Sequence, residues 1–452
     1  MASKVTIVFG LWLHLVRSYK TLSDETLLRL PRPDSDFDIY EGLILAPILR
    51  TRVPDTPGSV AVRNHFIEFF RSSLPEWTIE LHSFATTTPV SDGRNIRFTN
   101  FIAFRDPPGT EEGNTARLTI VAHADSKLRP TGFIGAMDSA APCAIIMHAA
   151  RSIDKALTRK WDTEDCSPAT SQGVQVIFTD GEERFSDPPV GITDQLYGSK
   201  ALAADWEKQK YPSTARYPNR LASISLFVLL DLLGASHPVV SSRSNMTHWV
   251  YKNLALLESR FRHLSGFQSI QCQTDISAAR SWLIDSHKGP DDLQPDNILD
   301  DHVPFSDRGV EVLSIIDHHP VRGFPGVWHT LDDDGAHLDM AVVGDWSLLV
   351  SAFMAEIRPQ GAGFAIWNQQ AATIVVLVAG PIALERIAWK FFLVLIAPTA
   401  LYIPVIYFFF PETKKKSLED INAQFGEVVA VGFEETQTGV EYREKASRPV
   451  RA

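Results

Sequence analysis

The sequence has few cysteines and no excess of positive charge. Three cysteines occur in 452 residues (Cys143, Cys166 and Cys272), and no two of them have CxxC spacing. This excludes a disulfide-built scaffold and a cysteine-rich metal site, because at most one bridge can form. The net charge of −11 argues against a nucleic-acid-binding surface. The 44% apolar and 21% charged residues are typical of a globular protein of more than one domain.

Segments typical of strands and helices alternate through most of the chain, and the sequence contains no internal repeat. The strand-like segments are residues 98–105, 117–123, 174–180, 225–234 and 310–316, and the helix-like segments are residues 141–157, 247–261 and 338–357. Several strand-like segments are nearly continuous apolar runs, which indicates strands covered on both faces. The alternation predicts an α/β domain, a three-layer sandwich around a mixed, mostly parallel sheet.

Polar residues fall where several of these strands end. His123 and Asp125 follow one strand, Asp231 lies in another apolar segment, and Glu182 and Glu183 follow the strand in VIFTDGEERF. Ligands of such sheets gather at the carboxyl ends of the strands. Because neighbouring side chains point in different directions, the two adjacent glutamates can have two separate roles.

Two further residues complete a candidate metal site. Asp138 stands just before a helix-like segment, and His329 lies in FPGVWHTLDDD. Taken singly, an aspartate before a helix is more often an N-cap, and an isolated histidine is usually unliganded. A catalytic zinc ion, however, takes about three nitrogen or oxygen ligands and keeps one position open. Asp138, His329 and the glutamate pair together supply such a set.

These segments resemble glutaminyl-peptide cyclotransferase, a relative of the zinc-dependent aminopeptidases. The resemblance covers roughly residues 19–357 and rests on AHADSK, GFIGAMDSAAPCA, FTDGEE with DQLYGSKALA, LLDLLGA, DDHVPF and VWHTLDD, in family order. It implies a zinc exopeptidase-like fold with one zinc ion held by Asp138, Glu183 and His329. It also implies the reaction, in which the N-terminal glutamine of a peptide or protein becomes pyroglutamate with release of ammonia; N-terminal glutamate would have a poorer leaving group.

The resemblance also implies roles for residues that do not bind the metal. Glu182 would be the general acid/base, Asp231 its hydrogen-bonded partner at the substrate amine, and Asp300 a member of the supporting network. Trp328, with Phe324, would form a wall of the glutamine pocket.

Three departures from the family pattern leave pocket shape and turnover open. Ser314 replaces a histidine of the network, the segment 184–198 lacks a tryptophan that usually follows the acids, and Ala122 replaces a cysteine that pairs with the position of Cys143 in animal relatives. Two alternatives to the cyclotransferase remain, the first because His123 and Asp231 are both present and the second because of these departures. One is a two-zinc aminopeptidase, in which His123 is a second-metal ligand, Asp138 bridges both ions and Glu182 activates a water. The other is an inactive protein with the zinc-enzyme fold.

Both ends of the chain differ in character from the middle. Residues 1–18 have the lysine and short apolar run of a secretory signal peptide. Residues 391–410 carry no charge over twenty positions, enough to cross a membrane, and three lysines follow at 414–416. Residues 364–384 form a second apolar segment, which contains more polar residues than the first. We expect a signal peptide (1–18), a catalytic domain (19–360) and a tail of hydrophobic helices (361–452).

The tail also carries a second resemblance. FFFPETKKKSLEDINAQFGE is similar to the cytoplasmic end of major-facilitator sugar transporters. About ninety residues are too few for a transport path, so the tail is either a membrane anchor or the product of two joined reading frames. We expect an enzyme of the secretory pathway, secreted or membrane-anchored, with its catalytic domain in the lumen or outside the cell.

Overall fold

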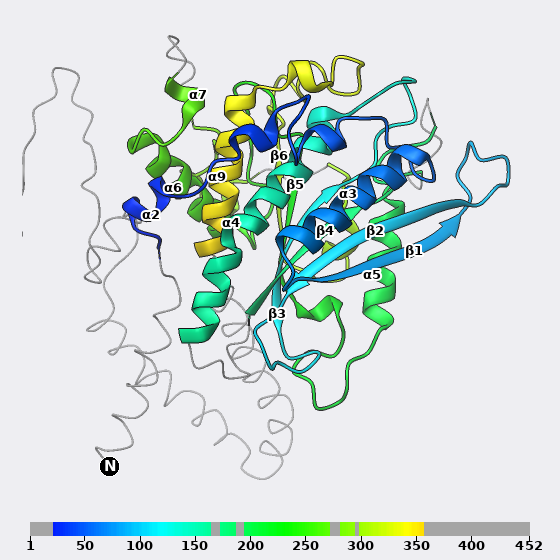
Figure 1. Ribbon diagram of the computed structural model, residues 1–452, viewed down its shortest axis with the longest axis horizontal. Helices are drawn as coiled ribbons and strands as arrows, with labels where there is room; N and C mark the ends of the chain where they lie inside the picture. Colours follow the sequence, from blue (N-terminus) through cyan, green and yellow to red (C-terminus); the bar gives the residue numbers. More distant parts are fainter. Residues whose placement is uncertain (1–20, 164–171, 187–193, 272–280, 294–297, 357–452) are drawn as a thin grey trace, which may run out of the picture. The chain divides into compact units, whose positions relative to one another are not determined.

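The computed structural model describes residues 21–163, 172–186, 194–271, 281–293 and 298–356 (Figure 1). The chain divides into two compact units, Met1–Phe364 and Ala365–Ala452, and every described residue belongs to the first. The expected signal peptide and the two apolar C-terminal segments lie outside the described residues. Within the described ranges, no helix is long and apolar enough to cross a membrane.

Six strands form one mixed sheet in the order β1-β2-β4-β3-β5-β6. Their bounds are β1 Thr78–Thr86, β2 Ile96–Arg105, β3 Ala116–His123, β4 Gln172–Thr179, β5 Ile224–Asp231 and β6 Val312–Ile316. Strands β4, β3, β5 and β6 run parallel to one another, whereas β2 pairs antiparallel with both β1 and β4. This confirms the predicted α/β class and the mixed sheet.

Helices cover both faces of this sheet. Phe101 of β2 and Phe178 of β4 stack on each other, and both rings contact Phe66 of α3 (Pro57–Ser73). The preceding residue, Asn100, points to the opposite face, where its amide donates to the carbonyl of Gly198 in α5 (Tyr197–Lys208) at 3.0 Å. Helices α3 and α5 therefore lie on opposite faces, which gives three layers.

The predicted helices are present with small changes at their ends. They correspond to α4 (Ala141–Thr163), α6 (His248–His263) and α9 (Met340–Glu356), and α4 packs against α9 (Figure 1). The short helices are α2 (Asp24–Leu28), α7 (Gln268–Gln271) and α8 (Val303–Ser306). The sequence reading missed α3, although Thr56 caps its first turn by accepting the Ser59 N–H and Pro57 occupies the first position.

The end of β5 differs from the prediction in a way that matters for function. The expected strand at 225–234 stops at Asp231, because Leu232 takes a φ of 58° and Gly234 one of 157°. The chain turns there, so Asp231 is the last residue of the strand. The neighbouring β3 is buried along its whole length. The fold thus presents Asp231 and His123 at the same edge of the parallel strands.

Candidate metal centre and active site

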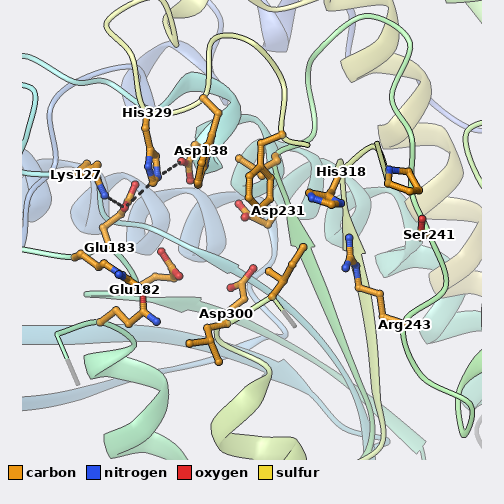
Figure 2. Close-up of a pocket in the computed structure, with 18 of the residues that line it drawn as sticks. Lys127, Asp138, Glu182, Glu183, Asp231, Ser241, Arg243, Asp300, His318 and His329 are labelled. Carbon is orange, nitrogen blue, oxygen red and sulfur yellow. Dashed lines mark hydrogen bonds and ion pairs between the residues drawn. The ribbon is translucent and has the colours of Figure 1, made fainter. Parts of the chain in front are cut away.

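The polar residues predicted at strand ends meet at one edge of the sheet. His123 ends β3, Asp231 ends β5, and Glu182 and Glu183 follow β4. Asp138 joins them from the segment before α4. Figure 2 shows Asp138, Glu182, Glu183 and Asp231 around one pocket, with Glu183 and Asp138 toward one side and Asp231 beside them. Because β4, β3 and β5 are adjacent and parallel, their carboxyl ends converge there.

The turn that carries the two glutamates is held by Asp125. Its Oδ1 accepts the backbone N–H of Glu182 and its Oδ2 that of Glu183, each at 3.1 Å. Gly181 takes a φ of 85°, and a Cβ there would lie 2.5 Å from the ring of Phe98, so the turn needs glycine. This arrangement fixes the backbone of both acids, while their side chains point in different directions.

Asp138, Glu183 and His329 form a group that could hold a metal ion, with one ligand atom from each lying within 4.8 Å of the others. Nε2 of His329 is 3.5 Å from Oδ2 of Asp138 and 3.6 Å from Oε2 of Glu183 (Figure 2). Both carboxylates are buried. His329 has a φ of 59°, a left-handed conformation that is uncommon for a residue other than glycine. The structure thus brings together all three residues of the predicted ligand set.

The chemistry of this group fits a divalent cation. Among the described residues, Oδ2 of Asp138 and Oε1 of Glu183 are buried without a hydrogen-bond partner. Burial, together with the charge of Asp138, raises the pKa of Glu183 to about 8, a repulsion that a cation would relieve. Burial also lowers the pKa of His329 to about 4, which keeps the imidazole neutral, as metal ligation requires. Lys127 donates to Oε2 of Glu183 at 3.1 Å, so Lys127 and a bound ion would share this carboxylate.

A second group of possible ligands consists of His123, Asp138 and Asp231. Here Nε2 of His123 lies 2.9 Å from Oδ1 of Asp138 and 3.5 Å from Oδ1 of Asp231. Burial disfavours the imidazolium, but the adjacent carboxylates of Asp125, Asp138 and Asp231 raise the pKa of His123 well above its usual value. Asp138 therefore directs one oxygen to His123 and leaves the other for the first group.

The acids beside the metal group crowd one another. Burial and the charge of Asp300 raise the pKa of Glu182 well above its usual value. Burial and the charge of Asp231 do the same to the pKa of Asp300. The Ser139 hydroxyl donates to Oδ1 of Asp231. A carboxyl group whose pKa is raised in this way can hold and release a proton near neutral pH.

Aromatic rings build one wall of the cavity, whose volume is about 910 Å³. The Phe324 and Trp328 ring centroids are 4.1 Å apart, and the indole of Trp328 stacks on His329 at 3.8 Å. The imidazole of His318 meets Phe324 edge-on at 4.7 Å. Figure 2 shows His318 on the pocket side next to Asp231. Both predicted wall residues thus line the cavity beside the metal group.

The departures noted in the sequence have structural outcomes. Ser314 is buried in β6 opposite Leu229 and is not among the described cavity residues, whereas His318, four positions later, is. Cys143 is a free, buried thiol whose Sγ donates to the carbonyl of His123. Residues 187–193, in the segment without the tryptophan, lie outside the described ranges.

Sequence reasoning assigned no role to several residues that shape the site. Asp125 and Lys127 stood in the AHADSK motif, which was a usable signal. Asp333 is the last residue of VWHTLDD, four positions after His329. Arg52 lies in RTRVP, where no motif marked it.

Comparison with known proteins agrees with this architecture. Residues 103–354 match peptidase family M28. The bovine glutaminyl-peptide cyclotransferase-like protein is 35% identical over 69% of this chain and 73% of its own length. The bovine glutaminyl-peptide cyclotransferase is 34% identical over 69% of this chain and 80% of its own length. The crystal structure of Macrostomum lignano glutaminyl cyclase superposes with a TM-score of 0.59 at 27% identity, covering 75% of this chain and 96% of that one.

A second, shorter match concerns the tail. Residues 344–425 are similar to the family of sugar and other transporters, and most of this range lies outside the described residues. The M28 match spans more than half of the chain and contains Asp138, the glutamate pair and His329. On these grounds the chain is a member of peptidase family M28, on the branch of the glutaminyl-peptide cyclotransferases.

Proposed function

We propose that the protein is a zinc-assisted glutaminyl-peptide cyclotransferase that acts on peptides or proteins beginning with glutamine, or more slowly with glutamate. The observation that carries this proposal is the division between two adjacent acids. Glu183 faces Asp138 and His329, whereas Glu182 lies next to Asp300 in the same cavity. The relatives' names support the same reaction.

In this proposal Asp138, Glu183 and His329 hold one zinc ion. A bound zinc ion supplies Lewis acidity to the oxygen of the substrate γ-carboxamide and stabilises the negative charge that develops on it. The side chain of Trp328, stacked on His329, forms the wall against which the glutamine side chain packs. Phe324 packs against that indole and lines the same cavity.

The protein's own acids move the protons. The α-amine nitrogen of the substrate attacks the carbon of its own side-chain amide, and the C–N bond to the amide nitrogen breaks. Glu182 accepts a proton from the amine and returns it to the departing nitrogen, which leaves as ammonia without consumption of water. Asp231 orients the amine, and burial together with the charge of Asp300 raises the pKa of Glu182, as a group that both accepts and returns a proton requires. Holding amine and amide in one bound geometry supplies much of the rate.

The second candidate is a metallo-aminopeptidase of the same family. The observation that favours it is the additional group of His123, Asp138 and Asp231. Against it, Nε2 of His123 lies 2.9 Å from Oδ1 of Asp138, which is a direct hydrogen bond. With that bond in place, His123 would support Asp138 and would not itself hold an ion. We therefore place the single-metal cyclotransferase first.

The proposal includes a location. The signal-like residues 1–18 direct the catalytic domain, residues 19–360, into the secretory pathway, and residues 361–452 are either a membrane anchor or the product of two joined reading frames. These end segments lie outside the described residues.

The test incubates the purified full chain, loaded with zinc, with a peptide that begins with glutamine. Mass spectrometry and an ammonia assay follow the products. Loss of one ammonia from an otherwise intact peptide is the expected result, whereas release of the free N-terminal residue would establish the aminopeptidase instead.

Two matched variants separate the roles of the adjacent acids. Glu182→Gln should abolish cyclisation while the protein retains its zinc, and Glu183→Gln should lose zinc as well as activity. Full cyclase activity in Glu182→Gln would refute the proposed proton transfer.

A further inference from the structure

Asp138, one of the three proposed metal ligands, is the last residue of the segment 134–138, which lies shortly before α4. Gly135 in this segment has a φ of 62°, and a Cβ there would lie 2.1 Å from the carbonyl oxygen of Asp138. The segment therefore folds tightly onto itself. The backbone is irregular at Asp138, which has non-helical φ and ψ, and two side chains from elsewhere in the chain bind several of the segment's backbone groups.

Arg52 binds the carbonyl side of the segment. Its guanidinium is fully buried and donates to the carbonyl oxygens of Ile134, of Gly135 at 2.9 Å and of Asp138 at 3.3 Å. Its own backbone N–H donates to Oγ of Ser126, in the loop after β3, at 2.9 Å. A planar fork with several fixed donors suits three carbonyl groups better than a single ammonium would.

Asp333 binds the N–H side of the same segment. Its backbone carbonyl accepts the N–H of Ala136 at 3.1 Å, and its Oδ1 accepts the N–H of Met137 at 2.7 Å. Asp333 is 1% exposed and follows His329 by four residues. It therefore ties the segment that carries His329 to the segment that carries Asp138.

We propose that Arg52 and Asp333 are positioning residues for the metal group, which together hold Asp138 and His329 at ligand distance. Neither side chain contacts substrate in this assignment. The proposal rests on the metal site of the proposed function. Outer residues that orient metal ligands typically change metal affinity by about 10–100-fold when they are removed.

Electrostatics and positioning predict opposite results at Arg52. A cation near the site repels a bound metal ion, so loss of the guanidinium charge by itself would tighten zinc binding. Loss of the three hydrogen bonds frees Asp138 and would weaken it. The direction of the change in zinc affinity therefore identifies the role of Arg52. A general loss of packing would lower stability without a specific effect on zinc affinity.

The experiment measures zinc affinity of the full chain by competition with a chelator. Arg52→Met is expected to bind zinc about 10–100-fold more weakly. Arg105→Met is the matched control, because Arg105 is also buried and bonded to Asp154 and Thr158 but lies away from the site. The zinc affinity of Arg105→Met should stay within about twofold of wild type, even if its unfolding temperature falls as far as that of Arg52→Met.

A second pair keeps the proposal falsifiable if Arg52→Met does not fold. Asp333→Ala removes the acceptor for Met137 and should weaken zinc binding by a similar factor, whereas Asp333→Asn keeps a side-chain oxygen and should restore most of it. Zinc binding as tight as wild type in Arg52→Met or Asp333→Ala would overturn the proposal. A wild-type chain that binds no zinc would overturn the metal site itself, and with it both proposals.

Discussion

Nε2 of His123 and Oδ1 of Asp138 are joined by a hydrogen bond of 2.9 Å inside the protein, where both residues are almost fully buried. This contact uses the oxygen of Asp138 that a bridging carboxylate would offer to a second metal ion. Metal content is therefore the measurement that separates the two chemistries that the ligand types in the sequence leave open.

We expect the purified protein to bind about one zinc ion per chain, because Asp138, Glu183 and His329 form one complete ligand set and His123 is hydrogen-bonded to Asp138. Elemental analysis of zinc-saturated protein measures this ratio. His123→Gln should keep its ion, while Glu183→Gln should lose it. Two ions in the wild type, falling to one in His123→Gln, would contradict the expectation and favour the aminopeptidase.

Replacement of Asp125 by alanine should lower kcat about 10–100-fold, because the backbone of Glu182 and Glu183 loses both of its acceptors and the acids shift from their working geometry. Asp125→Asn keeps one acceptor oxygen and should be intermediate. Steady-state kinetics with a glutamine-initiated peptide checks the order. Equal kcat in all three proteins would show that the turn does not depend on this carboxylate.

Replacement of Trp328 by alanine should raise KM for the peptide about threefold to tenfold, since an aromatic contact contributes about 0.5–1.5 kcal/mol beyond its buried area. Trp328→Phe retains a ring and should recover most of the loss. Initial rates over a range of peptide concentrations give both constants. An unchanged KM in the alanine variant would remove Trp328 from the substrate wall.

Asp317 should make the fold less stable as the pH rises. Burial raises its folded pKa to about 7, above the 3.8 of the exposed group, so the folded state binds the proton more tightly. The folding penalty therefore develops between about pH 4 and pH 7 and stays constant above that range; it amounts to a few kcal/mol at most.

Asp317→Asn tests this pH dependence, because its side-chain oxygen can still accept the Val239 N–H that Asp317 accepts at 2.8 Å. Urea unfolding should show the variant more stable than wild type at pH 8 and nearly equal to it at pH 4. A constant difference across this range would mean that Asp317 does not titrate as described.

Much of the fold could be predicted because the parallel strands are continuous apolar runs, a pattern that burial on both faces imposes. The prediction failed where the pattern is weaker. Strand β1 is half exposed along its length, so it carries no such run. The end of β5 was placed three residues too late, because Leu232 and Leu233 continue the apolar run after the backbone has turned.

The candidate site could likewise be predicted only in part from the sequence. Asp138, Glu183 and His329 could be chosen because each belongs to a motif of the family, and the structure places them together. Their roles stay predictions. Arg52 could not be chosen, because its contacts are to backbone carbonyls far away in the sequence, and such contacts leave no local pattern.

The three proposed ligands come from the segment before α4, the turn after β4 and the long loop after β6, stretches far apart in the sequence. An ion bound by all three would therefore cross-link the chain and close two long loops, whose closure costs conformational entropy. It would bind the folded chain and not the unfolded one, so part of the folding free energy would come from the ion. Chelators would then act on this protein as denaturants as well as inhibitors.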